Sequence, residues 1–196
     1  MCWFKRLKIK KILKNLKVAQ QYRLHNQPSD QNLRKEIVLY HQLAGLYASL
    51  QGHKKFPFAR EHKLACYRAA SALNDAEAQY LLGKSLLEEA KARDDLQRGE
   101  IFANQSNERY MKVLYEDAHA FLTSAESLHH IQARRLHGLC YINGWGVPID
   151  KSRGFDLIVE SIEQENSWDR VQKVFASIGI NKPAFFSELF QHRNKK

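Results

Sequence analysis

The sequence predicts an all-α fold: a short α-solenoid of antiparallel helix pairs, with about three degenerate repeats, an N-terminal basic helix and a C-terminal capping helix pair. Apolar residues recur at spacings of three and four through most of the chain, which is the period of an α-helix. The chain also contains a helix–turn–helix segment at residues 131–162 that recurs in part at residues 63–87. Because one helix hairpin cannot bury its own apolar faces, this recurrence predicts hairpins that pack on one another.

The segment 131–162 is the best-defined hairpin. Ala133, His137, Gly138 and Tyr141 mark one face of its first helix. Small residues at facing positions let two helices approach closely, so we place Gly138 at a contact with the second helix.

The turn of this hairpin is marked by glycines and a proline. Gly144 and Gly146 suit backbone conformations that other residues resist. The residue before Pro148 is pushed out of the helical region, so the chain is extended there. Asp150 then stands where the N-cap of the second helix is expected.

The net charge of +10 belongs to the ends of the chain. Eight basic residues precede the first acidic residue, Asp30, and three more lie in the last four positions. The body between the ends is nearly neutral, which argues against nucleic-acid binding as a property of the fold. We find no apolar run long enough to span a bilayer and no signal peptide.

The basic N-terminal segment, residues 1–28, is expected to be a separate helix. Four interpretations stay open: it packs an Ile/Leu face on the body, it contacts a membrane surface or a membrane protein, it contacts nucleic-acid phosphates, or it is disordered. For a membrane or partner contact the candidate residues are those with aromatic or basic side chains near its tip. They are Trp3, Phe4, Lys5, Arg6, Lys8, Lys10 and Lys11.

The repeat region is assigned to residues 29–178. A helix capped by Ser29 or Asp30 is expected to run to about Leu50. Two more helices are expected over 58–73 and from Ala76 to about residue 92, with Asp75 capping the second of these. A charged insertion at about 88–107 either extends helices or forms a loop. Ser167 and Pro183 begin two short C-terminal helices, the second of which starts the capping segment 179–196.

Two pairs of positions carry the recurrence. Ala78 and Gly83 align with Ala133 and Gly138, since in both copies the alanine precedes the glycine by five residues. With Tyr141, Gly144, Gly146 and Asp150, this pattern resembles the Sel-1-like repeat family, a branch of the tetratricopeptide-like helical repeats. The second helix departs from the family pattern at Gly154 and Phe155.

The resemblance implies a function as well as a fold. It implies protein binding in a concave groove lined by the first helices of the repeats, at 39–47, 80–87 and 134–141. It also implies a bacterial role in secretion, envelope or host-interaction complexes. The partner itself is not identified by any residue.

Few side chains point to catalysis or metal binding. His129, His130, His137 and Cys140 lie close in sequence, but His137 adjoins the packing glycine and Cys140 lies in an apolar run, so we expect no metal site. No nucleophile elbow, phosphate-binding loop or dinucleotide fingerprint is present. Cys66 and Cys140 are expected to be buried thiols without a disulfide.

The sequence therefore predicts a non-enzymatic protein–protein interaction scaffold or adaptor without a cofactor. Its expected location is the cytoplasm, including the inner face of the membrane. One alternative is a peripheral membrane protein anchored through the basic N-terminal helix. A weaker alternative is a nucleic-acid-binding protein.

Overall fold

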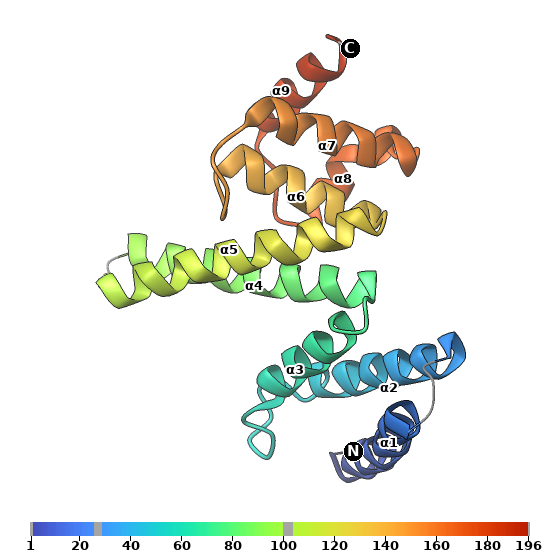
Figure 1. The fold of residues 1–196 in the computed structure, drawn as a ribbon. Helices are drawn as coiled ribbons and strands as arrows, with labels where there is room; N and C mark the ends of the chain where they lie inside the picture. Colours follow the sequence, from blue (N-terminus) through green and yellow to red (C-terminus); the bar gives the residue numbers. More distant parts are fainter. Residues whose placement is uncertain (1, 26–28, 100–103, 196) are drawn as a thin grey trace. The chain divides into compact units, whose positions relative to one another are not determined.

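A computed structural model describes residues 2–25, 29–99 and 104–195, and within these ranges every element of regular secondary structure is a helix (Figure 1). The helices are α1 (Cys2–His25), α2 (Asp30–Ala48), α3 (Ala59–Ser71), α4 (Ala76–Arg98), α5 (Gln105–Ser127), α6 (Ile131–Asn143), α7 (Lys151–Gln164), α8 (Val171–Ala176) and α9 (Pro183–Arg193). Neighbours in sequence pack on one another, as α1 does on α2, α2 on α3, and α6 on α7. The predicted all-α class is confirmed.

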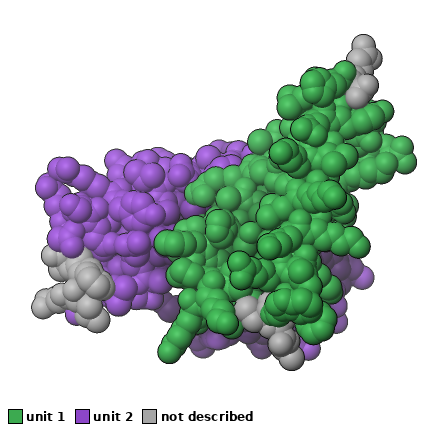
Figure 2. All heavy atoms as spheres, turned by 90° about the horizontal axis from the view of Figure 1, so that it is seen from below, with its two compact units in different colours: residues 1–82 green, residues 83–196 purple. Residues whose placement is uncertain are grey.

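The chain divides into two compact units, which are coloured separately in Figure 2. Unit 1 is Met1–Leu82 and unit 2 is Gly83–Lys196. The division falls inside the segment that the sequence assigns to the repeats.

The core of unit 1 lies where α2 faces α1 and α3. Tyr40, Leu43 and Tyr47 of α2 are buried there, together with Cys66 of α3 and Ile9 of α1. The apolar residues of α2 are distributed almost all round the helix, because it is covered on more than one side. Ser29 caps α2 by accepting a hydrogen bond from the backbone N–H of Asn32, one of the two caps the sequence offers.

In unit 2 the hairpin α6–α7 has the predicted turn. Gly144 is the C-cap of α6 with a left-handed φ of 71°, and the Asp150 carboxylate accepts a 3.0 Å hydrogen bond from the backbone N–H of Arg153. Gly146, at φ 72°, also touches α5: a β-carbon there would lie 2.2 Å from the carbonyl oxygen of Tyr115. The left-handed backbone at Gly144 and Gly146 therefore disfavours any other residue, and at Gly146 the contact with α5 also leaves no room for a side chain.

The helices of α6–α7 cross at a reciprocal glycine contact. A β-carbon on Gly138 would lie 2.6 Å from the carbonyl oxygen of Gly154, and one on Gly154 would lie 2.6 Å from the carbonyl oxygen of Gly138. Gly138 is thus at a helix contact. Gly154, where the second helix departs from the family pattern, supplies the other half of this contact.

The remaining repeat positions are also interior. Ala78, Ala133 and Tyr141 are buried. A β-carbon on Gly83 would lie 2.9 Å from Cγ of Leu122, so this glycine marks the packing of α4 on α5 within unit 2.

The insertion lengthens helices on both sides of residues 100–103, which lie outside the described residues. Helix α4 runs on to Arg98, and α5 begins at Gln105. Two hydrogen bonds tie these extensions together. The Gln97 side chain donates to Glu108 at 2.9 Å, and Asn107 donates to Gln97 at 2.8 Å.

Candidate interaction surface

Helix α1 packs along α2 in the opposite direction. Near its start, Lys5 Nζ donates a 3.1 Å hydrogen bond to the carbonyl oxygen of Ser49, at the C-terminal end of α2. Near its end, Arg23 pairs with Glu36 in the second turn of α2. Ile9 and Leu16 between them are buried in the core of unit 1. Of the four interpretations of this segment, the structure shows the first, in which the Ile/Leu face packs on the body.

The pair of Arg23 and Glu36 fixes the register of the two helices. Glu36 is only 1% exposed, and its two carboxylate oxygens accept hydrogen bonds from Arg23 at 2.8 and 3.4 Å. The hydrogen bond to Glu36 raises the pKa of Arg23 above its ordinary value. A buried carboxylate needs such a partner, because without one its charge is taken out of water uncompensated.

The other side of α1 is exposed and carries most of the candidate residues. Trp3 and Phe4 are 64% and 66% exposed, and their rings meet edge to face at 5.1 Å. On a helix of 3.6 residues per turn, Leu7 lies on the side opposite Ile9. The exposed basic residues on α1 include four of the candidates: Arg6, Lys8, Lys10 and Lys11.

Lys5 differs from the other candidates. Its side chain is half-buried and its amine is engaged with the end of α2, so it anchors α1 and does not belong to the exposed set. A lysine at this place also interacts favourably with the negative end of the α2 dipole.

The loop between α2 and α3 continues the exposed surface. Trp3 and Arg6 of α1 and Lys55 and Phe56 of the loop line one hollow of about 290 Å³. The loop is closed on itself by a 2.8 Å hydrogen bond from the Phe56 N–H to the carbonyl oxygen of His53.

This loop also adds aromatic and basic side chains that the sequence reading did not select. Phe58 is 64% exposed, and Lys54, four residues before it in the same loop, is exposed too. The signal was the pair of lysines followed by two phenylalanines in a turn. We call the combined set the aromatic–basic surface: Trp3, Phe4, Arg6, Leu7, Lys10 and Lys11 of α1 with Lys54, Lys55, Phe56 and Phe58 of the loop.

The net charge of the protein resides in unit 1. Residues 1–82 contain 15 basic and 5 acidic side chains, whereas residues 83–196 contain 16 of each. Unit 1 therefore carries the whole net charge of +10, and unit 2 is balanced. The net charge therefore attracts an anionic partner to unit 1 at long range.

The histidine candidates of unit 2 do not form one site. The ring of His130 caps α6 by accepting the N–H of Ala133, and burial raises the pKa of the Cys140 thiol to about 12. His129 has a positive φ of 62° at the end of α5. Within the described ranges, no group of three or more His, Cys, Asp or Glu side chains is arranged to hold a metal ion.

His137 instead belongs to a polar cluster between α5 and α6. It is buried, its Nδ1–H donates to the Glu126 carboxylate, and its Nε2 lies 3.1 Å from Nε2 of His119. Burial opposes the ionisation of Glu126, yet the hydrogen bond from His137 and nearby positive charges hold the pKa of Glu126 below its ordinary value. Burial and the facing His137 lower the pKa of His119.

The sequence reading missed His119. Its signal is the spacing of His119, Thr123 and Glu126, which puts three polar side chains on the face of α5 that meets α6. The cluster fills a helix contact with satisfied hydrogen bonds, as buried polar groups require.

Helix α6 offers little surface to a partner. From Arg135 to Tyr141 every residue is buried, so the part of the expected concave groove at 134–141 lies mainly in the interior. In α2, Leu43, Ala44 and Tyr47 are core residues too. The exposed aromatic and basic groups of α1 and its neighbouring loop form a more accessible surface.

Comparison with known proteins gives no relative: no family model, no curated protein and no solved structure matches this chain. Among the helices that the structure describes, none is both long enough and apolar enough to cross a bilayer.

Proposed function

We propose that this protein is a non-enzymatic helical scaffold that docks on an anionic membrane surface through the aromatic–basic surface of unit 1. The observation that supports this is the gathering of Trp3 and Arg6 of α1 with Lys55 and Phe56 of the loop around one hollow, in the unit that carries the net charge. The exposed Phe4 ring packs on Trp3 beside them.

Aromatic and basic side chains contribute to binding at a lipid surface in different ways. Tryptophan and phenylalanine bury ring area at the level of the headgroups, while each basic side chain near an anionic surface contributes about 1 kcal/mol. Leu7 favours lipid over nucleic acid, since an aliphatic side chain buries area in the acyl boundary but cannot stack on a base.

Packing on α2 makes α1 ready to bind. Many interfacial helices form only on the membrane and lose conformational entropy as they do so. Here Ile9 and Leu16 already hold the helix on α2, and the opposite side is displayed. Preorganisation of this kind lowers the cost of binding.

The scaffold part of the proposal draws on the resemblance to Sel-1-like repeats. Packing of helices in sequence order, together with the glycine turn after α6, supports a solenoid arrangement. A role in an envelope-associated or secretion complex is compatible with docking at the inner face of a membrane.

Vesicle flotation of the full chain tests the proposal. We expect the protein to float with vesicles of phosphatidylcholine and phosphatidylglycerol, and not with phosphatidylcholine alone. The variant Arg6→Gln/Lys10→Gln/Lys11→Gln should lower the partition coefficient about a hundredfold, at about 1 kcal/mol for each charge. Trp3→Ala/Phe4→Ala should also lower the partition coefficient, and this loss should be the same at low and high salt, because salt screens charges and not apolar contacts.

The matched control removes one exposed arginine and two exposed lysines of unit 2, with Arg170→Gln/Lys173→Gln/Lys182→Gln, and should leave flotation unchanged. Equal flotation of the triple variant and the control would overturn the proposal. A chain that ignores anionic vesicles but binds duplex DNA in a salt-dependent way would transfer the function to the nucleic-acid class.

A further inference from the structure

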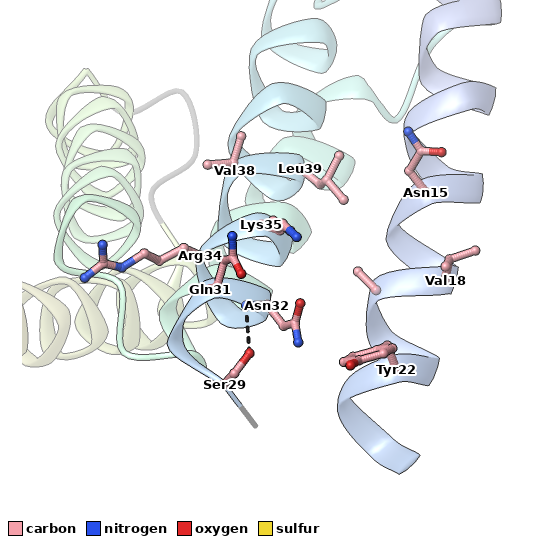
Figure 3. Close-up of a pocket in the computed structure, with 11 residues that line it drawn as sticks. Asn15, Val18, Tyr22, Ser29, Gln31, Asn32, Arg34, Lys35, Val38 and Leu39 are labelled. Carbon is pink, nitrogen blue, oxygen red and sulfur yellow. Dashed lines mark hydrogen bonds between the residues drawn. The ribbon is translucent and has the colours of Figure 1, made fainter. Parts of the chain in front are cut away.

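A second exposed feature of unit 1 is a groove between the C-terminal half of α1 and the first half of α2. Its volume is about 950 Å³. Figure 3 shows its two walls, with Asn15, Val18 and Tyr22 on α1 and Asn32, Lys35 and Leu39 among the residues on α2. The α2 side is formed by the N-cap residue and by residues of the first three turns of α2: Ser29, Gln31, Asn32, Arg34, Lys35, Val38 and Leu39.

The groove exposes apolar area that the fold does not cover. Val18 is 60% exposed and Val38 is 51% exposed, although both lie beside the partly buried Leu39 and Ala19. Valines on the rim of an apolar groove mark a contact site more specifically than scattered surface residues do.

The charge of the groove has one sign. Among the residues that the structure describes, the charged side chains lining the groove are those of Arg34 and Lys35, which are both exposed, and none is acidic. A second copy of unit 1 would bring a charge of the same sign to the groove, so self-association through it is opposed. The complementary occupant is acidic.

The shape of the groove fits a helix. Two antiparallel helices leave a furrow along which a third helix packs by inserting its ridge of side chains. The stretch from Ser29 to Leu39 is about 15 Å long at 1.5 Å per residue, which matches about three turns of a partner helix. Helix-in-groove recognition uses apolar anchors at i, i+3, i+4 and i+7.

We propose that this groove binds an acidic amphipathic helix of a partner protein, with its apolar ridge on Val18 and Val38 and its carboxylates beside Arg34 and Lys35. The inference does not rest on membrane docking. Along α1 the aromatic–basic surface ends at Lys11 and the groove begins at Asn15, about 6 Å further along the helix, so the two surfaces share no residue.

Fluorescence anisotropy with a labelled peptide tests the inference on the full chain. The probe is a 14-residue peptide with leucines at i, i+3, i+4 and i+7 and glutamates on the other face, compared with a scrambled peptide of the same composition. We expect the patterned peptide to bind about tenfold or more tightly than the scrambled one, because only the pattern presents a continuous apolar ridge.

Charge reversal then locates the site. Arg34→Glu/Lys35→Glu should weaken binding about tenfold, and a peptide carrying lysines in place of the glutamates should regain affinity for this variant. The matched control, Lys54→Glu/Lys55→Glu, makes the same change of net charge on the aromatic–basic surface and should leave the Kd within about twofold.

Val38→Glu tests the apolar part, since the side chain is exposed and its replacement does not enter the core. Loss of peptide binding with unchanged circular dichroism supports the groove. The proposal would be overturned if Arg34→Glu/Lys35→Glu and Val38→Glu bound the patterned peptide as tightly as the control Lys54→Glu/Lys55→Glu does. It would also be overturned if the wild-type chain bound the scrambled and the patterned peptide with equal affinity. Vesicle flotation of Arg34→Glu/Lys35→Glu, run in parallel, separates a failure of this site from a failure of membrane docking.

Discussion

The contact between Gly138 and Gly154 makes a strong prediction about the stability of unit 2. In Gly138→Ala, the new β-carbon would lie 2.6 Å from the carbonyl oxygen of Gly154 and 2.8 Å from Cγ1 of Ile158. The first of these atoms belongs to the backbone of α7. It cannot rotate away, so α6 and α7 must separate for the methyl group to fit.

The expected cost combines two opposing terms. Overpacking in a well-packed interface costs about 1–3 kcal/mol, while alanine gains up to about 1 kcal/mol over glycine in a helix interior. We therefore expect Gly138→Ala to lower the free energy of unfolding by about 1–2 kcal/mol. Gly138→Val, which is bulkier and a poorer helix former, should lose about 2–3 kcal/mol.

Urea denaturation followed by circular dichroism measures these changes. Gly45 provides the control, because it lies inside α2 and a β-carbon there would meet nothing within 4 Å. Gly45→Ala should raise the free energy of unfolding by up to about 1 kcal/mol, through helix propensity alone. If Gly138→Ala is as stable as the wild type or gains stability like Gly45→Ala, our account of the α6–α7 contact is wrong.

Three further predictions concern buried or partly buried titratable groups. Arg23→Met should cost about 3 kcal/mol in urea denaturation by leaving the buried Glu36 carboxylate unpaired, and adding Glu36→Leu should recover most of that loss; equal losses in the single and double variants would contradict this. Burial and a facing histidine lower the pKa of His119 below 6.5, so the unfolded state binds more protons. Stability should then fall as the pH is lowered from about 7 to about 5, and His119→Asn should flatten that slope in thermal melts. Burial raises the pKa of Cys66 to about 11 and of Cys140 to about 12. In the variant Cys2→Ser, neither thiol should therefore react with a thiol reagent until the protein is denatured.

Local signals in the sequence predicted local structure well. Asp150 as an N-cap, Gly144 at the end of α6 and Ser29 before α2 were identified because capping depends on residues within one turn. The helical class also followed from short-range periodicity. Each of these features needs no knowledge of what lies across the helix.

Contacts between helices were harder to predict. Gly138 was placed at a contact, but its partner Gly154 stood out in the sequence only as a departure from the repeat pattern. His119 was missed for the same reason, since it meets His137 from a different helix. Which residues face each other depends on the register of two helices, and one sequence does not contain that register.

The candidate surface was predicted in part. The exposed aromatic and basic residues of α1 were selected, but Lys5 proved to be an anchor, and Phe58 of the adjoining loop was not selected. Helix α1 has apolar residues on opposite sides: Ile9 and Leu16 toward α2, and Leu7 away from it. The sequence could not choose which side is covered, because the answer depends on α2.

The uneven distribution of charge also affects how molecules behave once they are bound. Free in solution, each copy carries +10, and like-charged copies repel one another. Unit 2 contributes nothing to this repulsion, because its 16 basic and 16 acidic side chains balance. An acidic surface that covers unit 1 therefore removes most of what keeps the copies apart. Molecules bound to an acidic surface should therefore pack side by side more densely than free molecules do in solution. The positive charge that attracts the protein to the surface is neutralised there and no longer keeps neighbouring copies apart.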